Sequence, residues 1–166
     1  MNNKLLSEHY ARELEAEYSA SRKCLERIPD NLYNFRPHTK SMEMGYLSLL
    51  VAEIPLWIAL TIKDGVIDLA TFKSGGLSTT DALVRNFDNN FKSAVDALRQ
   101  TTDDKLEDEF QLLSKGQLLM SSSKSESISS SINHWVHHRG QLTVYMRLNE
   151  IPVPSIYGPS ADERTF

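Results

Sequence analysis

The sequence predicts an all-α fold, namely a four-helix bundle with a long crossover before the last helix. Four long segments repeat apolar residues at helical spacing, and little of the chain alternates apolar and polar residues as a half-buried strand does. No linker or internal repeat divides the chain, and 166 residues are enough to bury a substantial core. We therefore expect one domain over residues 1–166.

The first helix is expected over residues 4–28, and Pro29 stops it. Ser41 is a suitable N-cap for a second helix over residues 42–64, which Pro55 should kink or locally loosen. The inward stripe of this second helix consists of Leu47, Leu50, Val51, Ile54, Trp57, Ile58 and Thr61.

Capping residues and turn signals predict the remaining elements. A Ser-Thr-Thr-Asp sequence resembles a helix start and predicts a third helix over residues 79–99. Residues 110–120 flank a glycine-containing turn and predict a small β-hairpin, which must lie against the helices to be stable. Ser123 and Glu126 have capping-box spacing and start the last helix, expected over residues 123–148. The inward periodicities should bring four residues to a shared interior: Leu50, Ile54, Phe87 and His134.

Composition and charge exclude several classes of function. The formal net charge of −4 and the lack of a lysine–arginine cluster argue against a nucleic-acid partner, because such binding depends on neutralising phosphates. The longest apolar run, residues 54–60, is too short to span a membrane, and the N-terminus lacks the apolar stretch of a signal peptide. Cys24 is the only cysteine, so an intrachain disulfide is impossible and a reducing cytoplasm fits best.

The second helix carries more apolar residues than one core face requires. Leu49, Leu56 and Leu60 fall outside its main inward stripe. We expect this surplus to be buried against a second copy of the chain, in a homodimer with the second helix near the symmetry axis.

Three of the five histidines lie close together in the last helix. His134 and His138 are four residues apart, so their imidazoles point to the same side, as in helical pairs that share a metal ion. Such a pair also arises by chance, since a single helical histidine is usually exposed or hydrogen-bonded in a core. His137 points about 100° away from His138 and fits a hydrogen-bonding role. His38 lies beside a proline and is expected to be structural or exposed, and His9 is assigned no role.

Glu53 is the one acidic residue within the apolar part of the second helix. Three roles are consistent with this position: a metal ligand, a hydrogen-bond acceptor for a ligand histidine, or a side chain that reaches solvent. The last two interpretations are favoured. Cys24 reads as a small core residue rather than a nucleophile. The sequence contains no Ser-His-Asp arrangement, glycine-rich phosphate loop or cysteine cluster.

Two blocks of the sequence resemble the DinB/YfiT-like family. The first includes residues 36–42 and 52–57, and the second runs from residues 133–147 into the proline-rich residues 151–163. The resemblance implies a four-helix bundle with a long crossover, often assembled as a homodimer. It also implies a divalent metal, such as nickel or zinc, held by three histidines.

The resemblance assigns the expected ligands residue by residue. Two ligands come from an H-x-x-x-H pair on the last long helix, which falls on His134 and His138, and the third position falls on Leu50. Leucine cannot bind metal, and two imidazoles leave a weaker, more open site than three protein ligands. We therefore expect a degenerate metal site, with nickel or zinc weakly bound or absent, unless Glu53 or a small molecule supplies the third ligand.

Two functions compete, and the sequence does not decide whether the protein is an enzyme. In the first, the protein has a non-catalytic or binding role, with a small-molecule ligand in the bundle cleft. In the second, as the resemblance implies, a divalent metal on His134 and His138 serves a hydrolase or a thiol S-transferase by lowering the pKa of a bound water or thiol. Arg139 or Tyr145 would then bind an anionic substrate if they face the cleft.

Overall fold

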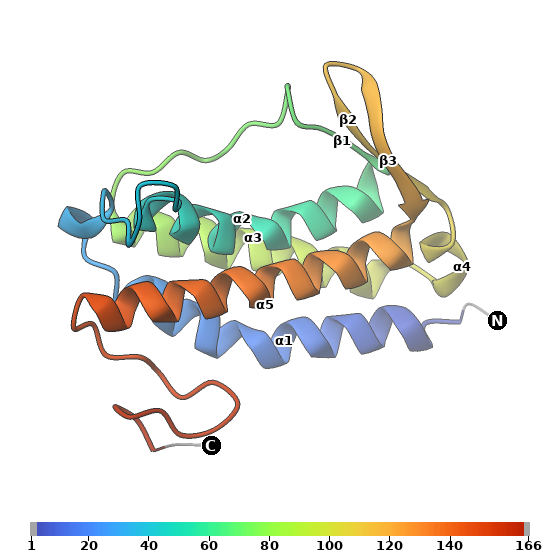
Figure 1. Ribbon diagram of the computed structural model, residues 1–166. Helices are drawn as coiled ribbons and strands as arrows, with labels where there is room; N and C mark the ends of the chain where they lie inside the picture. Colours follow the sequence, from blue (N-terminus) through green and yellow to red (C-terminus); the bar gives the residue numbers. More distant parts are fainter. Residues whose placement is uncertain (1–2, 165–166) are drawn as a thin grey trace.

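The computed structural model describes residues 3–164 and is mostly helical, with a small three-stranded sheet at one end (Figure 1). Two short helices, η1 (Asp30–Leu32) and α4 (Asp103–Leu106), lie in the connections. The four long helices that the sequence predicts all form, within two residues of their expected bounds. They are α1 (Leu5–Glu26), α2 (Met44–Lys63), α3 (Thr80–Gln100) and α5 (Lys124–Leu148).

Side-chain caps determine where α3 and α5 begin. The Thr79 hydroxyl accepts a hydrogen bond from the Ala82 backbone N–H at the start of α3. At the start of α5, Ser123 accepts from the Glu126 N–H, and the Glu126 carboxylate accepts from the Ser123 N–H. The capping box expected from the sequence is thus present, and it fixes the register of the helix that carries the histidine pair.

The long helices run in two directions. α2 and α3 run the same way, whereas α1 and α5 run opposite to them (Figure 1). Because α2 and α3 are parallel, the chain must return along the length of the helices, and residues 69–79 make this return (Figure 1). The connection before α5 stays at one end of the molecule. The long crossover therefore precedes α3 rather than the last helix, since helical periodicity gives no information on helix direction.

The sheet contains three strands in the order β1 (Val66–Asp68), β2 (Glu109–Ser114) and β3 (Gln117–Ser123). β2 and β3 form the hairpin expected from the sequence, with positive φ at Lys115 and Gly116 in its turn. β1 pairs parallel with β2, and the Asp68 carboxylate accepts hydrogen bonds from the backbone N–H groups of Lys115 and Gly116. The all-α prediction is therefore corrected to a mostly helical fold with a small sheet.

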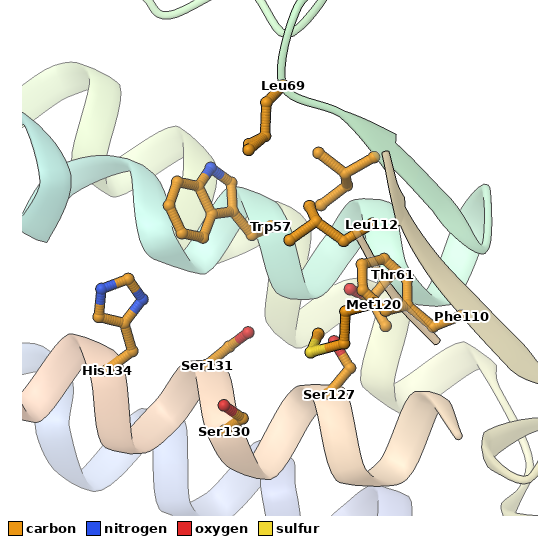
Figure 2. A pocket seen from close by; sticks show the side chains of 11 residues that line it. Trp57, Thr61, Leu69, Phe110, Leu112, Met120, Ser127, Ser130, Ser131 and His134 are labelled. Atoms are coloured by element: carbon orange, nitrogen blue, oxygen red, sulfur yellow. The ribbon is translucent and has the colours of Figure 1, made fainter. Parts of the chain in front are cut away.

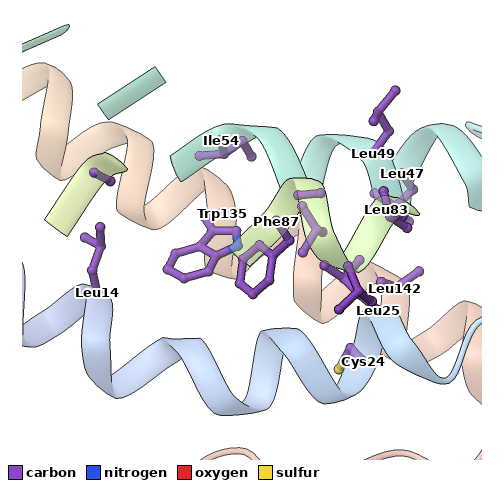
Figure 3. Close-up of a cluster of buried hydrophobic side chains, with 14 of the residues drawn as sticks. Leu14, Cys24, Leu25, Leu47, Leu49, Ile54, Leu83, Phe87, Trp135 and Leu142 are labelled. Atoms are coloured by element: carbon purple, nitrogen blue, oxygen red, sulfur yellow. The ribbon is translucent and has the colours of Figure 1, made fainter. Parts of the chain in front are cut away.

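The core lies between the long helices (Figure 3). Phe87 of α3 packs against Trp135 of α5, with ring centroids 5.9 Å apart, and Ile54 of α2 belongs to the same buried cluster. Cys24 is also buried there, as expected, and burial raises the pKa of its thiol to about 11. α2 continues through Pro55 without interruption.

The surface of α2 differs in part from the expectation. Leu49 belongs to the buried core, while Leu56 and Leu60 are half-buried. Within residues 3–164, α2 is the one helix long and apolar enough to span a membrane. Most of it is buried against the rest of the fold, as in the core helix of a soluble protein, so this is weak evidence for a membrane span.

Candidate functional site

His134 and His138 lie on successive turns of α5, and their Nε2 atoms are 2.7 Å apart. His138 Nδ1 is 2.8 Å from Gln141 Oε1, an atom that can only accept a hydrogen bond. In its neutral form, His138 therefore carries its proton on Nδ1 and accepts at Nε2. It follows that His134 donates from Nε2 to His138, which leaves His134 Nδ1 as an acceptor.

The surroundings of His134 favour its uncharged imidazole. His138 is buried, whereas His134 is half-buried, with its ring centroid 5.6 Å from that of Trp57 on α2. Burial lowers the pKa of His134, and the neighbouring His138 and His137 lower it further. A neutral imidazole is the form that binds metal, so the lowered pKa of His134 favours the protonation state that a metal ligand needs.

His38 is exposed, as expected, whereas His137 meets His138 through a ring contact rather than through the hydrogen bond expected of it. His137 is exposed, and the edge of its ring meets the ring of His138 at a centroid distance of 5.2 Å. His38 is also exposed, and its Nδ1 accepts a hydrogen bond from the Lys40 backbone N–H. Neither side chain adds a third donor to the pair.

Leu50 occupies the side of α2 where a third ligand is expected. It lies two turns before Trp57 on the same helical face, and Trp57 is the α2 residue that meets the His134 ring. α2 and α5 run antiparallel (Figure 1). A residue two turns before Trp57 therefore lies toward the C-terminal end of α5, the end at which His138 follows His134. Leu50 is half-buried rather than a core residue, and it offers no atom that binds a metal.

Glu53 adopts neither of the arrangements favoured from the sequence. Its side chain is buried, and Oε1 accepts hydrogen bonds from Ser74 Oγ at 2.8 Å and from the Gly75 N–H at 2.6 Å. Both donors lie in the crossover over residues 69–79. Glu53 therefore fastens this crossover to α2 through Oε1.

The two imidazoles form only part of a metal site. Within the part of the chain that the structure describes, no group of three or more His, Cys, Asp or Glu side chains is arranged to hold a metal. Two nitrogens bound to one tetrahedral zinc ion lie about 3.3 Å apart, given Zn–N distances of about 2.0–2.1 Å. His134 and His138 would need to separate by roughly half an ångström, and His134 would need to move its proton from Nε2 to Nδ1.

Arg139 and Tyr145 do not serve the cleft. The fully buried Arg139 donates hydrogen bonds to Glu17 and Ser21 of α1 and to the Tyr157 hydroxyl in the C-terminal segment. The Tyr145 hydroxyl donates to the backbone carbonyl of Met42. The expected contact with an anionic substrate is therefore not supported, because the polar atoms of both residues are used to hold the fold together.

A cavity of ≈ 270 Å³ opens beside His134, between α2, α5 and the sheet (Figure 2). α2 contributes Trp57 and Thr61, and α5 contributes His134 together with three serines. The sheet closes the remaining side with apolar residues. Sequence reasoning missed this cavity because its wall depends on the parallel pairing of β1 with β2. The one local signal in the sequence was that Ser127, Ser130 and Ser131 precede His134 at the spacing that puts all four on one face of α5.

The sequence resemblance predicts a helical protein whose last long helix carries an H-x-x-x-H pair. The structure has this arrangement, with His134 and His138 on α5. The sequence model of the DinB family matches residues 1–165, and the chain therefore belongs to this family. A segment of 32 residues is 56% identical to the uncharacterized protein YrdA of Bacillus subtilis. That match covers 19% of each protein, so it spans about a fifth of YrdA.

Solved structures of DinB-like proteins share the fold. One from Bacillus cereus has a TM-score of 0.72 at 22% identity, covering 95% of this chain and 100% of that chain. YjoA from Bacillus subtilis has a TM-score of 0.70 at 18% identity, covering 95% and 99%. A DinB-family protein from Exiguobacterium sibiricum has a TM-score of 0.68 at 16% identity, covering 92% and 97%. At these identities the similarity demonstrates a common fold and carries no information on ligands.

Proposed function

We propose that this chain is a DinB-family protein with a degenerate metal site, and that it binds a small molecule in the cleft beside His134 rather than catalysing a metal-dependent reaction. We take its four long helices as the four-helix bundle of the family. The observation that carries the proposal is the donor set: two imidazoles hydrogen-bonded to each other, with Leu50 at the expected third position.

The donor set opposes metal binding in three ways. A metal must break the hydrogen bond between the two Nε2 atoms and the tautomer of His134 that it fixes. It gains two protein ligands instead of three, which leaves the remaining coordination to water. Glu53 is already used at the crossover, where its Oε1 accepts two hydrogen bonds. We therefore expect any nickel or zinc to be weakly held and easily removed by chelators.

Calorimetric titration of the untagged protein with Ni²⁺ and Zn²⁺ tests this proposal. Leu50→His should raise the affinity at least about 100-fold, because it adds a facing imidazole to a packed scaffold. Ile62→His is the matched control, since Ile62 is also a half-buried apolar residue of α2 but lies on a different helical face from Leu50, Leu56 and Leu60. An equal gain in both variants, or tight stoichiometric binding by the unchanged protein, would contradict the proposal.

The second candidate function is a metal-dependent hydrolase or thiol S-transferase. It is favoured by the convergence of His134 and His138 and by the lowered pKa of His134, which keeps this imidazole neutral. A metal bound there would lower the pKa of a coordinated thiol or water. Under this alternative, adding a low-molecular-weight thiol should strengthen Zn²⁺ binding by the protein beyond the affinity of zinc for the thiol alone.

We also propose that the protein is cytoplasmic and homodimeric, with α2 near the symmetry axis. The single buried cysteine supports a reducing compartment. The half-buried Leu56 and Leu60 support a second copy against α2, although Leu49 no longer contributes because it lies in the core.

A further inference from the structure

The cavity beside His134 has walls of two kinds. Phe110, Leu112 and Met120 give the sheet side an apolar surface, while α5 presents the hydroxyls of small serines (Figure 2). No aspartate, glutamate, lysine or arginine is among the side chains that line it. A charged ligand would therefore lose its hydration without gaining an opposite charge. The wall chemistry selects for a neutral molecule.

Two buried polar atoms of this wall have no hydrogen-bond partner among residues 3–164. They are Thr61 Oγ1 and Trp57 Nε1. Thr61 is fully buried, yet its hydroxyl does not bond to the preceding turn, as Ser48 in the same helix does with the Met44 carbonyl. Buried polar atoms are nearly always paired in native structures. Both residues line the cavity, so a small rotation of either side chain would let a ligand group complete its polar atom.

His134 offers a third polar group at one end of the cavity. Its Nε2 is engaged by His138, so Nδ1 is the ring nitrogen left for a ligand. In the tautomer fixed by Gln141 and His138, Nδ1 accepts a hydrogen bond. A ligand hydroxyl can donate to this nitrogen or pair with Thr61, and its oxygen can accept from the Trp57 N–H.

We propose that this cavity binds a neutral aromatic molecule that carries a hydroxyl group. The proposal rests on the proposed binding function and names the class of its ligand. The volume of ≈ 270 Å³ is nearly twice that of an engineered cavity of about 150 Å³ that holds benzene, so two fused rings fit. The apolar sheet side and the Trp57 ring contact the aromatic body, and the unpaired polar atoms select the hydroxyl.

Calorimetric titration of the untagged full chain with 2-naphthol, naphthalene and 2-naphthoate, in the presence of EDTA, tests the proposal. We expect 2-naphthol to bind with one molecule per chain. Naphthalene should bind about 2- to 10-fold more weakly, because it leaves the polar atoms unpaired. Binding of 2-naphthoate should be at least about 100-fold weaker than that of 2-naphthol, because its charge is uncompensated. Failure of 2-naphthol to bind, or equal binding of all three compounds, would overturn the proposal.

Three variants test whether the compounds bind in the cavity or elsewhere on the surface. Thr61→Val keeps the side-chain shape and should reduce the preference for 2-naphthol over naphthalene. Leu112→Trp should fill the cavity and abolish binding of both compounds. Leu118→Trp is the matched control, because Leu118 is an exposed leucine of the same hairpin that does not line the cavity. Unchanged binding by folded Leu112→Trp, or an unchanged preference in Thr61→Val, would refute the assignment.

The ligand titration and the metal titration test separate claims, so either claim can fail without the other. If 2-naphthol binds in EDTA while the unchanged protein also binds Zn²⁺ tightly, the ligand class stands and the degenerate metal site is wrong. If the metal titration agrees with a degenerate site but no probe binds, the ligand class is wrong and the donor-set reasoning stands.

Discussion

Arg139→Met is expected to destabilise the protein strongly because it removes one partner of a buried ion pair. The Arg139 side chain is 2% exposed and that of Glu17 is 13% exposed. The guanidinium also donates to Ser21 Oγ at 3.2 Å and to the Tyr157 hydroxyl at 2.7 Å. The substitution therefore leaves a largely buried carboxylate without its cation and removes the hydrogen bond from α5 to the Tyr157 hydroxyl.

The magnitude follows from the burial of the two partners. Removing one partner of a buried pair costs about 3–5 kcal/mol, and the partial exposure of Glu17 places this case near the lower value, about 3 kcal/mol. Arg99→Met is the matched control, since Arg99 also pairs with a glutamate of α1, Glu15, but these side chains are 52% and 38% exposed. That pair should contribute only about 0–1 kcal/mol.

Urea unfolding followed by circular dichroism measures both free energies of unfolding. Adding Glu17→Gln to Arg139→Met should restore part of the stability, because it removes the unpaired charge. Equal losses for Arg139→Met and Arg99→Met would refute the reasoning, as would a double variant less stable than Arg139→Met alone.

Three further predictions concern reactivity, pH and assembly. The Cys24 thiol, buried with a pKa raised to about 11, should react with a thiol reagent only after unfolding, and rapid labelling of the native protein would contradict its placement. The pKa of His134 is lowered from 6.5 in the folded protein, so the unfolded chain binds more protons at mildly acidic pH. The stability that His134 contributes is therefore complete above pH 6.5 and is lost as the pH falls through the pKa of the folded state. His134→Gln should therefore show a shallower fall in the urea midpoint between about pH 7 and pH 5, and parallel curves would count against the shift. Light scattering at micromolar concentration should give twice the chain mass of 18.8 kDa, and a lasting value of 18.8 kDa would exclude the homodimer.

Local signals predicted the helices, the hairpin and the histidine pair. The Ser123–Glu126 capping box acts over one turn, and the convergence of His134 and His138 follows from a spacing of four residues. The hairpin likewise depends on adjacent strands and a short turn that contains Gly116. Each of these features is determined within a few residues, so a single sequence is enough to reveal it.

The features that were missed depend on distant partners. β1 has only three residues, and it becomes a strand by pairing in parallel with β2 more than 40 residues later, at Val66 and Gln111. Glu53 finds its donors at Ser74 and Gly75, across the crossover. Periodicity shows which residues project from the same face of a helix, but it does not show which other element that face contacts. The cavity beside His134 escaped prediction for the same reason.

The metal content of the protein, purified without a histidine tag and dialysed, tests the central claim most directly. Elemental analysis should find well under one nickel or zinc ion per chain, and brief exposure to a chelator should remove what is present. One tightly held ion per chain that survives the chelator would contradict the claim, because it would mean that another group has taken the position of Leu50 as third ligand.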